Sequence, residues 1–390
     1  MNKKQNFDFD LPVDRRNSAS IKWDYYKGKD IIPLWVADMD FKSPPAVLDA
    51  LHRRIEHGVF GYTHASEQLK EVVAAMLAAR YGWRIEWDWL VWLPGLVTAL
   101  NVACRAIGQE GDAVMTTVPA YPPFLSAPGH FKRDLIAVPL EESGNHWRID
   151  FDRVEDAITP QTRLFMLCNP HNPVGRVYSR EELSTLAEIC KRRDIIICSD
   201  EIHCGLILDK DKIHIPTATL DASIADRTIT LMAPSKTFNT PGLGCAFAII
   251  SNKELRSQYI RAMAGIVPLV NVLGYAATLA AFRDCSAWHS ALLDYLRSNR
   301  DIVAQAVSEI PGLFMAPVEA TYLAWIDVRN AGIQNPIQFF EDAGVGLQDG
   351  KDFGGPGFVR LNFGCRRGLL EKALSRISAA MASGGHSLKR

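Results

Sequence analysis

The strongest constraint on the fold is the alternation of short apolar runs with segments of helical spacing. Residues 179–193 show the helical pattern best, because Ser179 and Glu182 are placed as a capping box and apolar residues recur at helical spacing. Runs with the length of a strand buried on both faces cover residues 114–117, 135–138, 164–168, 195–198, 228–232 and 245–250. This alternation predicts βαβ units, and therefore an α/β fold built on a mainly parallel sheet.

The rest of the chain predicts a second, smaller domain. A helix is expected from Ser66 to Gly82, and the helical pattern of residues 271–308 could connect two domains. Residues 322–328 and 358–362 have the pattern of short strands in an α+β unit, and the proline-rich start of the chain predicts an extended arm. The predicted organisation is an arm contributing to the small domain, a large domain and a C-terminal small domain, at residues 1–45, 46–285 and 286–390.

The composition excludes several classes of function. The 390 residues are 48% hydrophobic and 22% charged, with a formal net charge of −1, so neither a nucleic-acid partner nor an anionic membrane surface is expected. No apolar run approaches the ~20 residues that span a membrane, and the first ten residues lack the apolar core of a signal peptide. The eight cysteines are scattered without a CxxC pair, which predicts reduced thiols, no metal site and a cytoplasmic protein.

Two segments place reactive side chains directly after predicted strands. The segment APSKTFNTPG, residues 233–242, puts Lys236 at a strand end, where ligands of open α/β sheets collect. A lysine there can form a Schiff base if desolvation keeps its amine partly neutral, although a lone Ser-Lys pair is more often a solvated loop. Asp200 ends the apolar run IIICSD and could pair with a protonated pyridine nitrogen, or equally well cap the following helix.

Three further segments suit a flat, phosphorylated ligand. The turn CNPHNPVG, residues 168–175, exposes Asn172 as a candidate donor to a phenolate oxygen. The segment PGLVTAL, residues 94–100, predicts a helix start whose free N–H groups suit a phosphate. In PAYPP, Tyr121 is held in a proline-framed turn where its ring could stack on a cofactor. Each of these signals alone is also compatible with a purely structural role.

The five signals occur together and in order along the chain. Their combination resembles the fold-type I pyridoxal-phosphate enzymes of the class I/II aminotransferase superfamily, and the resemblance spans almost the whole chain. It implies the PLP-dependent transferase fold, whose large domain has a seven-stranded sheet flanked by helices. It also implies pyridoxal 5′-phosphate as the cofactor, with no metal.

The resemblance assigns the catalytic roles to three residues. Lys236 would carry the cofactor as a Schiff base and remove the α proton of the substrate. Asp200 would pair with the pyridine nitrogen, and Tyr121 would stack on the ring. Asn172 would donate a hydrogen bond to the 3′ oxygen of the cofactor, and His203 stands beside it where typical aminotransferases of this superfamily have a tyrosine.

The remaining assignments concern the phosphate, the substrate and a second subunit. Ser235 and the amides of Leu96 and Val97 would bind the phosphate. Arg360, in FVRLN, would clamp the substrate carboxylate through its guanidinium, a task suited to a planar bidentate donor, with Ala37 beside the substrate. Tyr62 would reach the phosphate of a neighbouring subunit, so that the resemblance implies a homodimer with a shared active site.

Four short motifs narrow the resemblance to one branch. The segments KWDY, VADMDF, GVFGY and DEIH resemble the MalY/PatB group of cystathionine β-lyases and cysteine desulfhydrases; they lie at residues 22–25, 36–41, 58–62 and 200–203. In addition, Gly244 stands where many aminotransferases have a phosphate-binding arginine.

This branch implies a carbon–sulfur β-lyase acting on a small sulfur-containing amino acid. The expected reaction converts L-cystathionine or a cysteine S-conjugate into pyruvate, ammonia and a thiol. Two alternatives stay open. One is an aminotransferase of broad amino-acid range, which would need a keto-acid acceptor, and the other is a regulatory binding protein that kept the fold.

Overall fold

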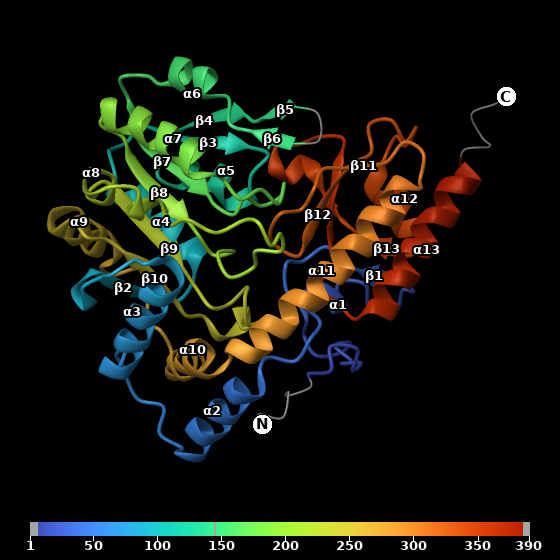
Figure 1. Cartoon of the computed structure of the whole chain (residues 1–390), viewed down its shortest axis with the longest axis horizontal. Coiled ribbons are helices and arrows are strands. Elements are labelled where there is room, and N and C mark those ends of the chain that lie inside the picture. Colours follow the sequence, from blue (N-terminus) through green and yellow to red (C-terminus); the bar gives the residue numbers. More distant parts are fainter. Residues whose placement is uncertain (1–6, 144–145, 385–390) are drawn as a thin grey trace.

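A mixed seven-stranded sheet forms the centre of the larger part of the molecule (Figure 1). The computed structural model describes residues 7–143 and 146–384. The strand order is β2-β10-β9-β8-β7-β3-β4, and within this sheet only β10 runs antiparallel to its neighbours. The strands are β2 Leu90–Leu93, β3 Ala113–Val118, β4 Asp134–Pro139, β7 Thr162–Cys168, β8 Ile196–Asp200, β9 Thr228–Met232 and β10 Ala246–Ile249.

All six predicted strands are present, and the predicted fold class and seven-stranded sheet are confirmed. The seventh strand, β2, was missed because its four residues directly follow a tryptophan-rich stretch that has no clear period. One expectation about burial was wrong. Residues 135–138 were expected to be buried on both faces, but β4 lies at the edge of the sheet and Leu135 is 38% exposed.

Helices cover both faces of this sheet, so its central strands are apolar at nearly every position. In β7, for example, Leu164 and Met166 belong to the core on one face, whereas Phe165 and Leu167 belong to the core on the other. The first face is covered by α4 Leu96–Ala106, α5 Pro122–His130 and α9 Lys253–Met263. The second face is covered by α6 Phe151–Ala157, α7 Arg180–Arg192, α8 Ala222–Ala225 and, beside β10, α3 Glu67–Tyr81.

The predicted helix boundaries follow from their caps. Ser179 and Glu182 form the expected capping box of α7. The side chain of Ser66 caps α3, which ends at Gly82 in the left-handed conformation that glycine favours. The pattern of residues 271–308 is two helices rather than one, since the chain breaks at the cap residue between α10 Val272–Asp284 and α11 Ser286–Ser308.

The smaller part of the molecule combines the arm with the C-terminal third (Figure 1). Its antiparallel sheet has the order β11-β12-β15-β14, and β1 of the arm pairs in parallel with β13. These strands are β1 Ile32–Pro33, β11 Phe314–Met315, β12 Leu323–Asp327, β13 Val345–Gly346, β14 Gln348–Asp349 and β15 Phe358–Asn362. The predicted strands at 322–328 and 358–362 are thus present, and the domain boundaries at 45 and 285 stay a prediction.

The arm is less extended than predicted. It contains the single helical turn α1 Ile21–Asp24, which the side chain of Ser20 caps. The remaining elements are the helices α2 Pro45–Glu56, α12 Pro336–Asp342 and α13 Arg367–Gly384 and the hairpin of β5 Glu141–Ser143 and β6 His146–Arg148. All eight cysteines are free thiols. In the described ranges, no helix is both long enough and apolar enough to cross a membrane.

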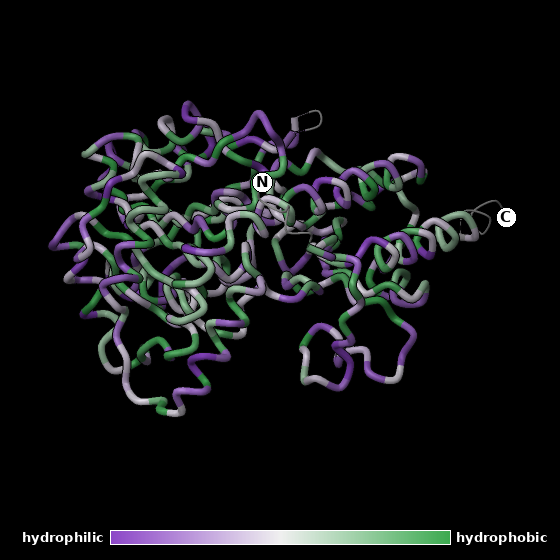
Figure 2. Tube along the Cα trace, turned by 60° about the horizontal axis from the view of Figure 1, so that its bottom comes forward, coloured by the Kyte–Doolittle hydropathy of each residue, from purple (hydrophilic) through white to green (hydrophobic). Residues whose placement is uncertain are grey.

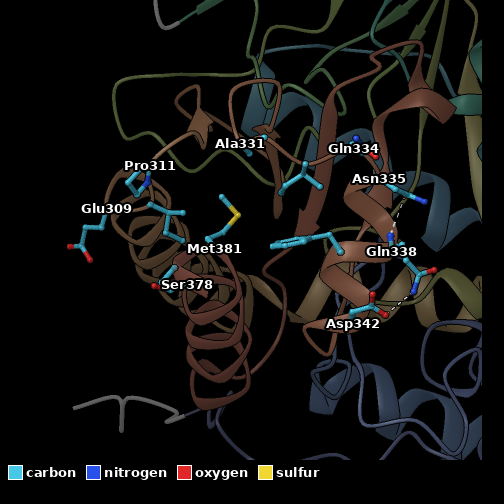
Figure 3. A pocket seen from close by; sticks show the side chains of 14 residues that line it. Glu309, Pro311, Ala331, Gln334, Asn335, Gln338, Asp342, Ser378 and Met381 are labelled. Atoms are coloured by element: carbon cyan, nitrogen blue, oxygen red, sulfur yellow. Dashed lines mark hydrogen bonds between the residues drawn. The ribbon is translucent and has the colours of Figure 1, made fainter. Parts of the chain in front are cut away.

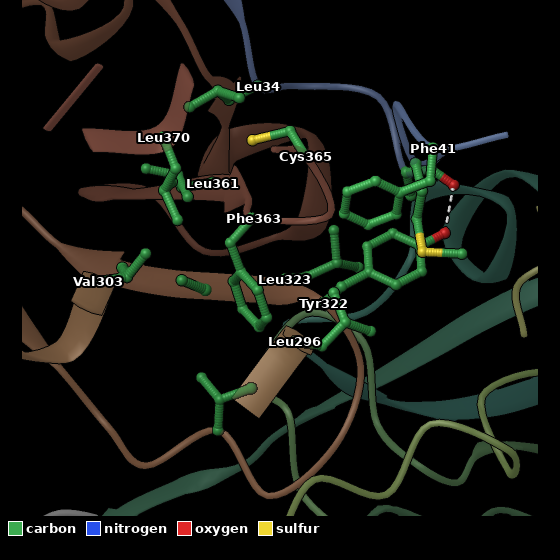
Figure 4. Close-up of a cluster of buried hydrophobic side chains, with 14 of the residues drawn as sticks. Leu34, Phe41, Leu296, Val303, Tyr322, Leu323, Leu361, Phe363, Cys365 and Leu370 are labelled. Carbon is green, nitrogen blue, oxygen red and sulfur yellow. Dashed lines mark hydrogen bonds between the residues drawn. The ribbon is translucent and has the colours of Figure 1, made fainter. Parts of the chain in front are cut away.

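One hydrophobic core joins the arm to the smaller part. It contains Phe41 from the arm, Leu296 and Val303 from α11, Leu323 from β12 and Leu361 from β15 (Figure 4). Along the chain, hydrophobic stretches run through the interior and hydrophilic segments lie mainly at the periphery (Figure 2). The arm is therefore held by burial of apolar surface and not by strand pairing alone.

Leu296 tests this core. Its side chain is fully buried, so Leu296→Ala should lower the free energy of unfolding by about 2–5 kcal/mol through lost burial and a residual cavity. The half-buried Leu293 on the same helix is the matched control, and Leu293→Ala should cost clearly less. Denaturation by urea measures both values. Equal losses for the two variants would contradict a packed core at this place.

Candidate active site

The polar segments predicted from the sequence meet at one edge of the large sheet. Six of its strands point in the same direction, so the segments that follow β2, β3, β7, β8 and β9 gather at their carboxyl ends. A cavity of about 230 Å³ lies there. Nine predicted residues line it: Ala37, Leu96, Val97, Tyr121, Asn172, Asp200, His203, Ser235 and Lys236.

Two predicted residues do not line this cavity. Arg360 of β15 lies directly behind it, because its guanidinium donates to Asn172 Oδ1 at 3.1 Å and to the carbonyl of Trp35 at 3.0 Å. The guanidinium also stacks over the ring of Phe353 at 4.6 Å. Tyr62 is fully exposed on the connection between α2 and α3, outside the cavity of its own chain.

Lys236 lines the cavity, with its amine turned toward the arm. Its Nζ donates to the carbonyl of Ala37 at 2.6 Å. Loss of hydration lowers the pKa of Lys236 to about 8, helped by the charge of Arg360 and opposed by Asp38 and Asp200. About a tenth of the amine is therefore neutral at pH 7, far more than for an ordinary lysine, and the neutral form is the one that a nucleophile or a base requires.

Asp200 and His203 are two buried ionisable groups that line the same cavity. Burial raises the pKa of Asp200 to about 7, although its Oδ1 accepts the N–H of Ile202 at 3.1 Å. Burial also lowers the pKa of His203 to about 3, so the imidazole is neutral. Its Nδ1 has no hydrogen-bond partner within the described ranges. Such strongly shifted groups, gathered in one cavity, mark a functional site.

The start of α4 also lines the cavity. Its cap residue is Gly95, which provides no side-chain cap, so the first N–H groups of this 11-residue helix are available to a ligand. Gly244 borders the same region with a φ of +54°, and a Cβ there would lie 3.1 Å from the carbonyl of Pro94. A side chain at position 244 would be strained, which agrees with a glycine there in place of the phosphate-binding arginine of many aminotransferases.

Residues 29–377 match the model of the family described as aminotransferase class I and II. The chain belongs to this family. Cystathionine β-lyase PatB of Bacillus subtilis is 36% identical over 387 residues, which are 96% of this chain and 100% of PatB. The crystal structure of OvoB is 47% identical with a TM-score of 0.95, covering 97% of this chain and 100% of that one. The pyridoxal-phosphate-bound C–S lyase of Staphylococcus hominis is 33% identical with a TM-score of 0.91, covering 96% and 98%.

The cavity of this aminotransferase class I/II protein fits pyridoxal phosphate, the group bound in the S. hominis structure. Lys236 offers an amine to an aldehyde. Asp200 offers a buried carboxylate to which no cationic side chain of residues 7–143 or 146–384 is bonded, as a protonated ring nitrogen needs. The unpartnered Nδ1 of His203 and the uncapped start of α4 are further polar groups that such a ligand would satisfy.

The residues that hold the arm against the lysine were not predicted. Lys22 is fully buried and pairs with Asp40 at 2.8 Å, while Arg15 pairs with Asp38 at 2.7 Å. Asn239, three residues after Lys236, donates to two carbonyls of the arm segment. Lys22, Asp38 and Asp40 of this class I/II aminotransferase arm were visible in its motifs, whereas Arg15 was not. The contacts were not predicted, because the two ion pairs join residues 18 and 23 positions apart and Asn239 bonds to residues 200 and 198 positions away.

A larger cavity of about 710 Å³ lies between the ends of α11, α12 and α13 (Figure 3). Its polar residues already serve the helices around it: Asn335 caps α12 by accepting the N–H of Gln338, and Gln338 donates to Asp342 at 2.8 Å. None of the predicted site residues lines it. Size alone therefore does not identify the functional cavity of this family member.

Asp200 makes stability depend on pH when no ligand is bound. Its folded-state pKa of about 7 lies above the ordinary value of 3.8. The desolvation penalty is therefore absent below pH 3.8, grows as the pH rises and is complete above about 7. Asp200→Asn removes this penalty, so the Tm of the ligand-free variant should exceed that of the wild type by a margin that widens across this range.

The control for this titration is Asp194→Asn. The Asp194 side chain is 93% exposed, so it carries no desolvation penalty that a substitution could relieve. Thermal melts over a pH series measure both variants against the wild type. A constant Tm difference between wild type and Asp200→Asn at all pH values would contradict a buried, protonatable Asp200.

Proposed function

We propose that this protein is a pyridoxal-phosphate-dependent carbon–sulfur β-lyase, which converts L-cystathionine or a related cysteine S-conjugate into pyruvate, ammonia and a thiol. The observation that carries this proposal is the cavity itself, where a partly neutral Lys236 faces a buried Asp200 beside an uncapped helix start. The names of relatives, cystathionine β-lyase PatB and C–S lyase, support the reaction.

The residues around the cavity would hold the cofactor. Lys236 would bind it covalently, and the Asp200 carboxylate would accept a hydrogen bond from its ring nitrogen. Tyr121 would stack on the ring, whereas Asn172 and the neutral His203 would bond its 3′ oxygen. The N–H groups of α4, at Leu96 and Val97, would bind the phosphate together with the hydroxyl of Ser235.

The substrate carboxylate is bound by Arg360, whose guanidinium is held in orientation by Asn172, the carbonyl of Trp35 and the ring of Phe353. When bound, the cofactor supplies an acceptor for the electron pair left on the substrate α carbon. The Lys236 amine would be the base that takes the α proton of the substrate. Loss of the thiolate from the β carbon and addition of one water balance the reaction to pyruvate, ammonia and a thiol.

The same residues would also serve transamination, and two features favour elimination. His203 stands in place of the usual tyrosine, and its low pKa keeps it neutral beside the cofactor oxygen. Gly244 leaves the phosphate with one cation fewer than many aminotransferases provide. Transamination needs a keto acid as acceptor, whereas elimination does not, so the products distinguish the two.

Pyruvate release from L-cystathionine tests the proposal. With no keto acid added, the purified and cofactor-loaded protein should release pyruvate continuously, because elimination regenerates the enzyme. Lys236→Ala should abolish release and the covalent cofactor absorbance together. The matched control is Lys132→Ala, which removes an exposed lysine paired with Glu110 and should leave the rate unchanged.

Pyruvate formation only when a keto acid is supplied would replace the lyase by an aminotransferase. No turnover of any S-conjugate by protein that binds the cofactor would favour a binding role on the same fold.

The proposal includes a homodimer that shares its active sites. The connection between α2 and α3 exposes three large side chains, with Val59 62%, Phe60 57% and Tyr62 100% accessible. Apolar side chains so exposed on one short segment suit a subunit contact. In the dimer, Tyr62 of each subunit reaches the phosphate in the other.

The free cysteines support the further proposal of a cytoplasmic location.

Subunit mixing tests this sharing. Tyr62→Ala and Lys236→Ala should each have little activity as pure proteins. Unfolded together and refolded, they should form hybrid dimers with one intact site, which recovers up to roughly a quarter of the wild-type rate for random pairing in a two-fold dimer. A mixture no more active than its components would show that Tyr62 acts within its own subunit or not at all.

A further inference from the structure

The carbonyl oxygen of Ala37 accepts hydrogen bonds from two side chains. Lys236 Nζ donates to it at 2.6 Å, and the hydroxyl of Tyr322 donates at 2.8 Å. Tyr322 is 1% exposed and comes from the start of the small antiparallel sheet, where its ring lies edge-on to that of His203. It belongs to none of the predicted motifs, yet it reaches the atom that receives the lysine amine.

The backbone before Tyr322 is held in an unusual conformation. Thr321 is fully buried and has a φ of +77°, a region that β-branched residues rarely adopt. Its N–H donates to the carbonyl of Leu206 at 2.9 Å, and its hydroxyl accepts the N–H of Leu323 at 3.1 Å. Strain of this kind persists only where the surroundings enforce it, and it is common near functional sites.

The arm segment around Ala37 is held independently of Tyr322. Asn362 donates to the carbonyls of Val36 and Asp38, at 2.5 and 2.7 Å. Asn239 donates to the carbonyls of Met39 and Phe41. The Tyr322 hydroxyl is therefore not needed to anchor the arm, and its bond to Ala37 calls for another explanation.

We propose that Tyr322 is a positioning residue for Lys236, acting through the Ala37 carbonyl that both side chains bind. The proposal rests on the cofactor-binding role of Lys236 in the proposed function. The hydroxyl proton of Tyr322 points at the same oxygen as the protons of the lysine amine. The positive end of this O–H dipole therefore lies close to the lysine amine and disfavours its protonated, ammonium form. Tyr322 therefore increases the neutral fraction of the amine, and the neutral amine is the form that takes a proton from the substrate.

The other groups that face Lys236 set the background for this effect. Asp38 of the arm and Asp200 of β8 favour the charged amine, whereas Arg360 of β15 opposes it. His203 is neutral because burial lowers its pKa, and burial likewise raises the pKa of Tyr322, so that its hydroxyl keeps its proton. Tyr322 thus acts as a fixed dipole and not as a titrating group.

Tyr322→Phe removes this hydroxyl and keeps the ring against His203. In the full-length protein freed of cofactor, the rate at which trinitrobenzenesulfonate labels Lys236 is followed over a pH series by mass spectrometry of its peptide. We expect the midpoint of labelling to rise by about half a pH unit, which is about threefold less labelling below the midpoint. In the loaded enzyme, kcat should fall by a similar factor with KM unchanged, because Arg360 still binds the carboxylate.

The matched control is Tyr259→Phe. The Tyr259 hydroxyl is equally buried and also donates to a backbone carbonyl, that of Ala99, at 2.9 Å, but it lies in the separate core that α4 and α9 form against the large sheet. Its removal should leave the labelling midpoint of Lys236 where it is. An unchanged or lowered midpoint in Tyr322→Phe, or an equal rise in Tyr259→Phe, would overturn the proposal.

The labelling experiment is separate from the test of the proposed function. It uses neither substrate nor cofactor, so it reports on the lysine whatever reaction the protein catalyses. If the lyase proposal fails, the wild type releases no pyruvate, while Tyr322→Phe still raises the labelling midpoint of Lys236. If the present inference fails, the wild type releases pyruvate, but Tyr322→Phe leaves the labelling midpoint of Lys236 unchanged.

Discussion

Desolvation of Lys236 and Asp200 at one edge of the sheet is the constraint on which the rest of the site depends. Burial moves their pKa values toward one another, to about 8 and about 7. In water both groups would be fully charged near neutral pH, whereas here, with no ligand bound, the amine is partly neutral and the carboxyl group partly protonated. The parallel strands accomplish this by ending together: Asp200 is the last residue of β8, and Lys236 follows the end of β9 and bonds to the arm.

The arm is therefore part of the active site and not an appendage. Two ion pairs stabilise the folded arm: the fully buried Lys22 pairs with Asp40, and Arg15 pairs with Asp38. Burying such charges is tolerable only because each has a bonded partner of opposite sign. Asn239 from the lysine loop and Asn362 from the small sheet then hold the same segment from both sides. Through these contacts, the two parts of the molecule define the position of one carbonyl, that of Ala37.

Much of the fold could be predicted because it depends on local patterns. The apolar strands alternate between two helix layers, and caps such as Ser179 with Glu182 mark helix ends within a few residues. The prediction failed where position in the sheet, rather than local pattern, decides burial. Leu135 is as apolar as its neighbours in the chain, but β4 is an edge strand and leaves it 38% exposed. Conversely, β2 follows directly on a tryptophan-rich stretch without a clear period, and only its pairing with β10 marks it as a strand.

The sequence by itself determined which chemical groups stand at the strand ends: an amine after β9, a carboxylate at the end of β8, and an uncapped helix start after β2. Those groups depend only on residue type and on the strand that precedes them. Only the tertiary structure decided how they are tuned. Ala37 is 199 residues from Lys236 and 285 from Tyr322, yet the three meet at one oxygen atom. No local pattern encodes such a meeting, because it arises from packing of the arm and the small sheet against the large one.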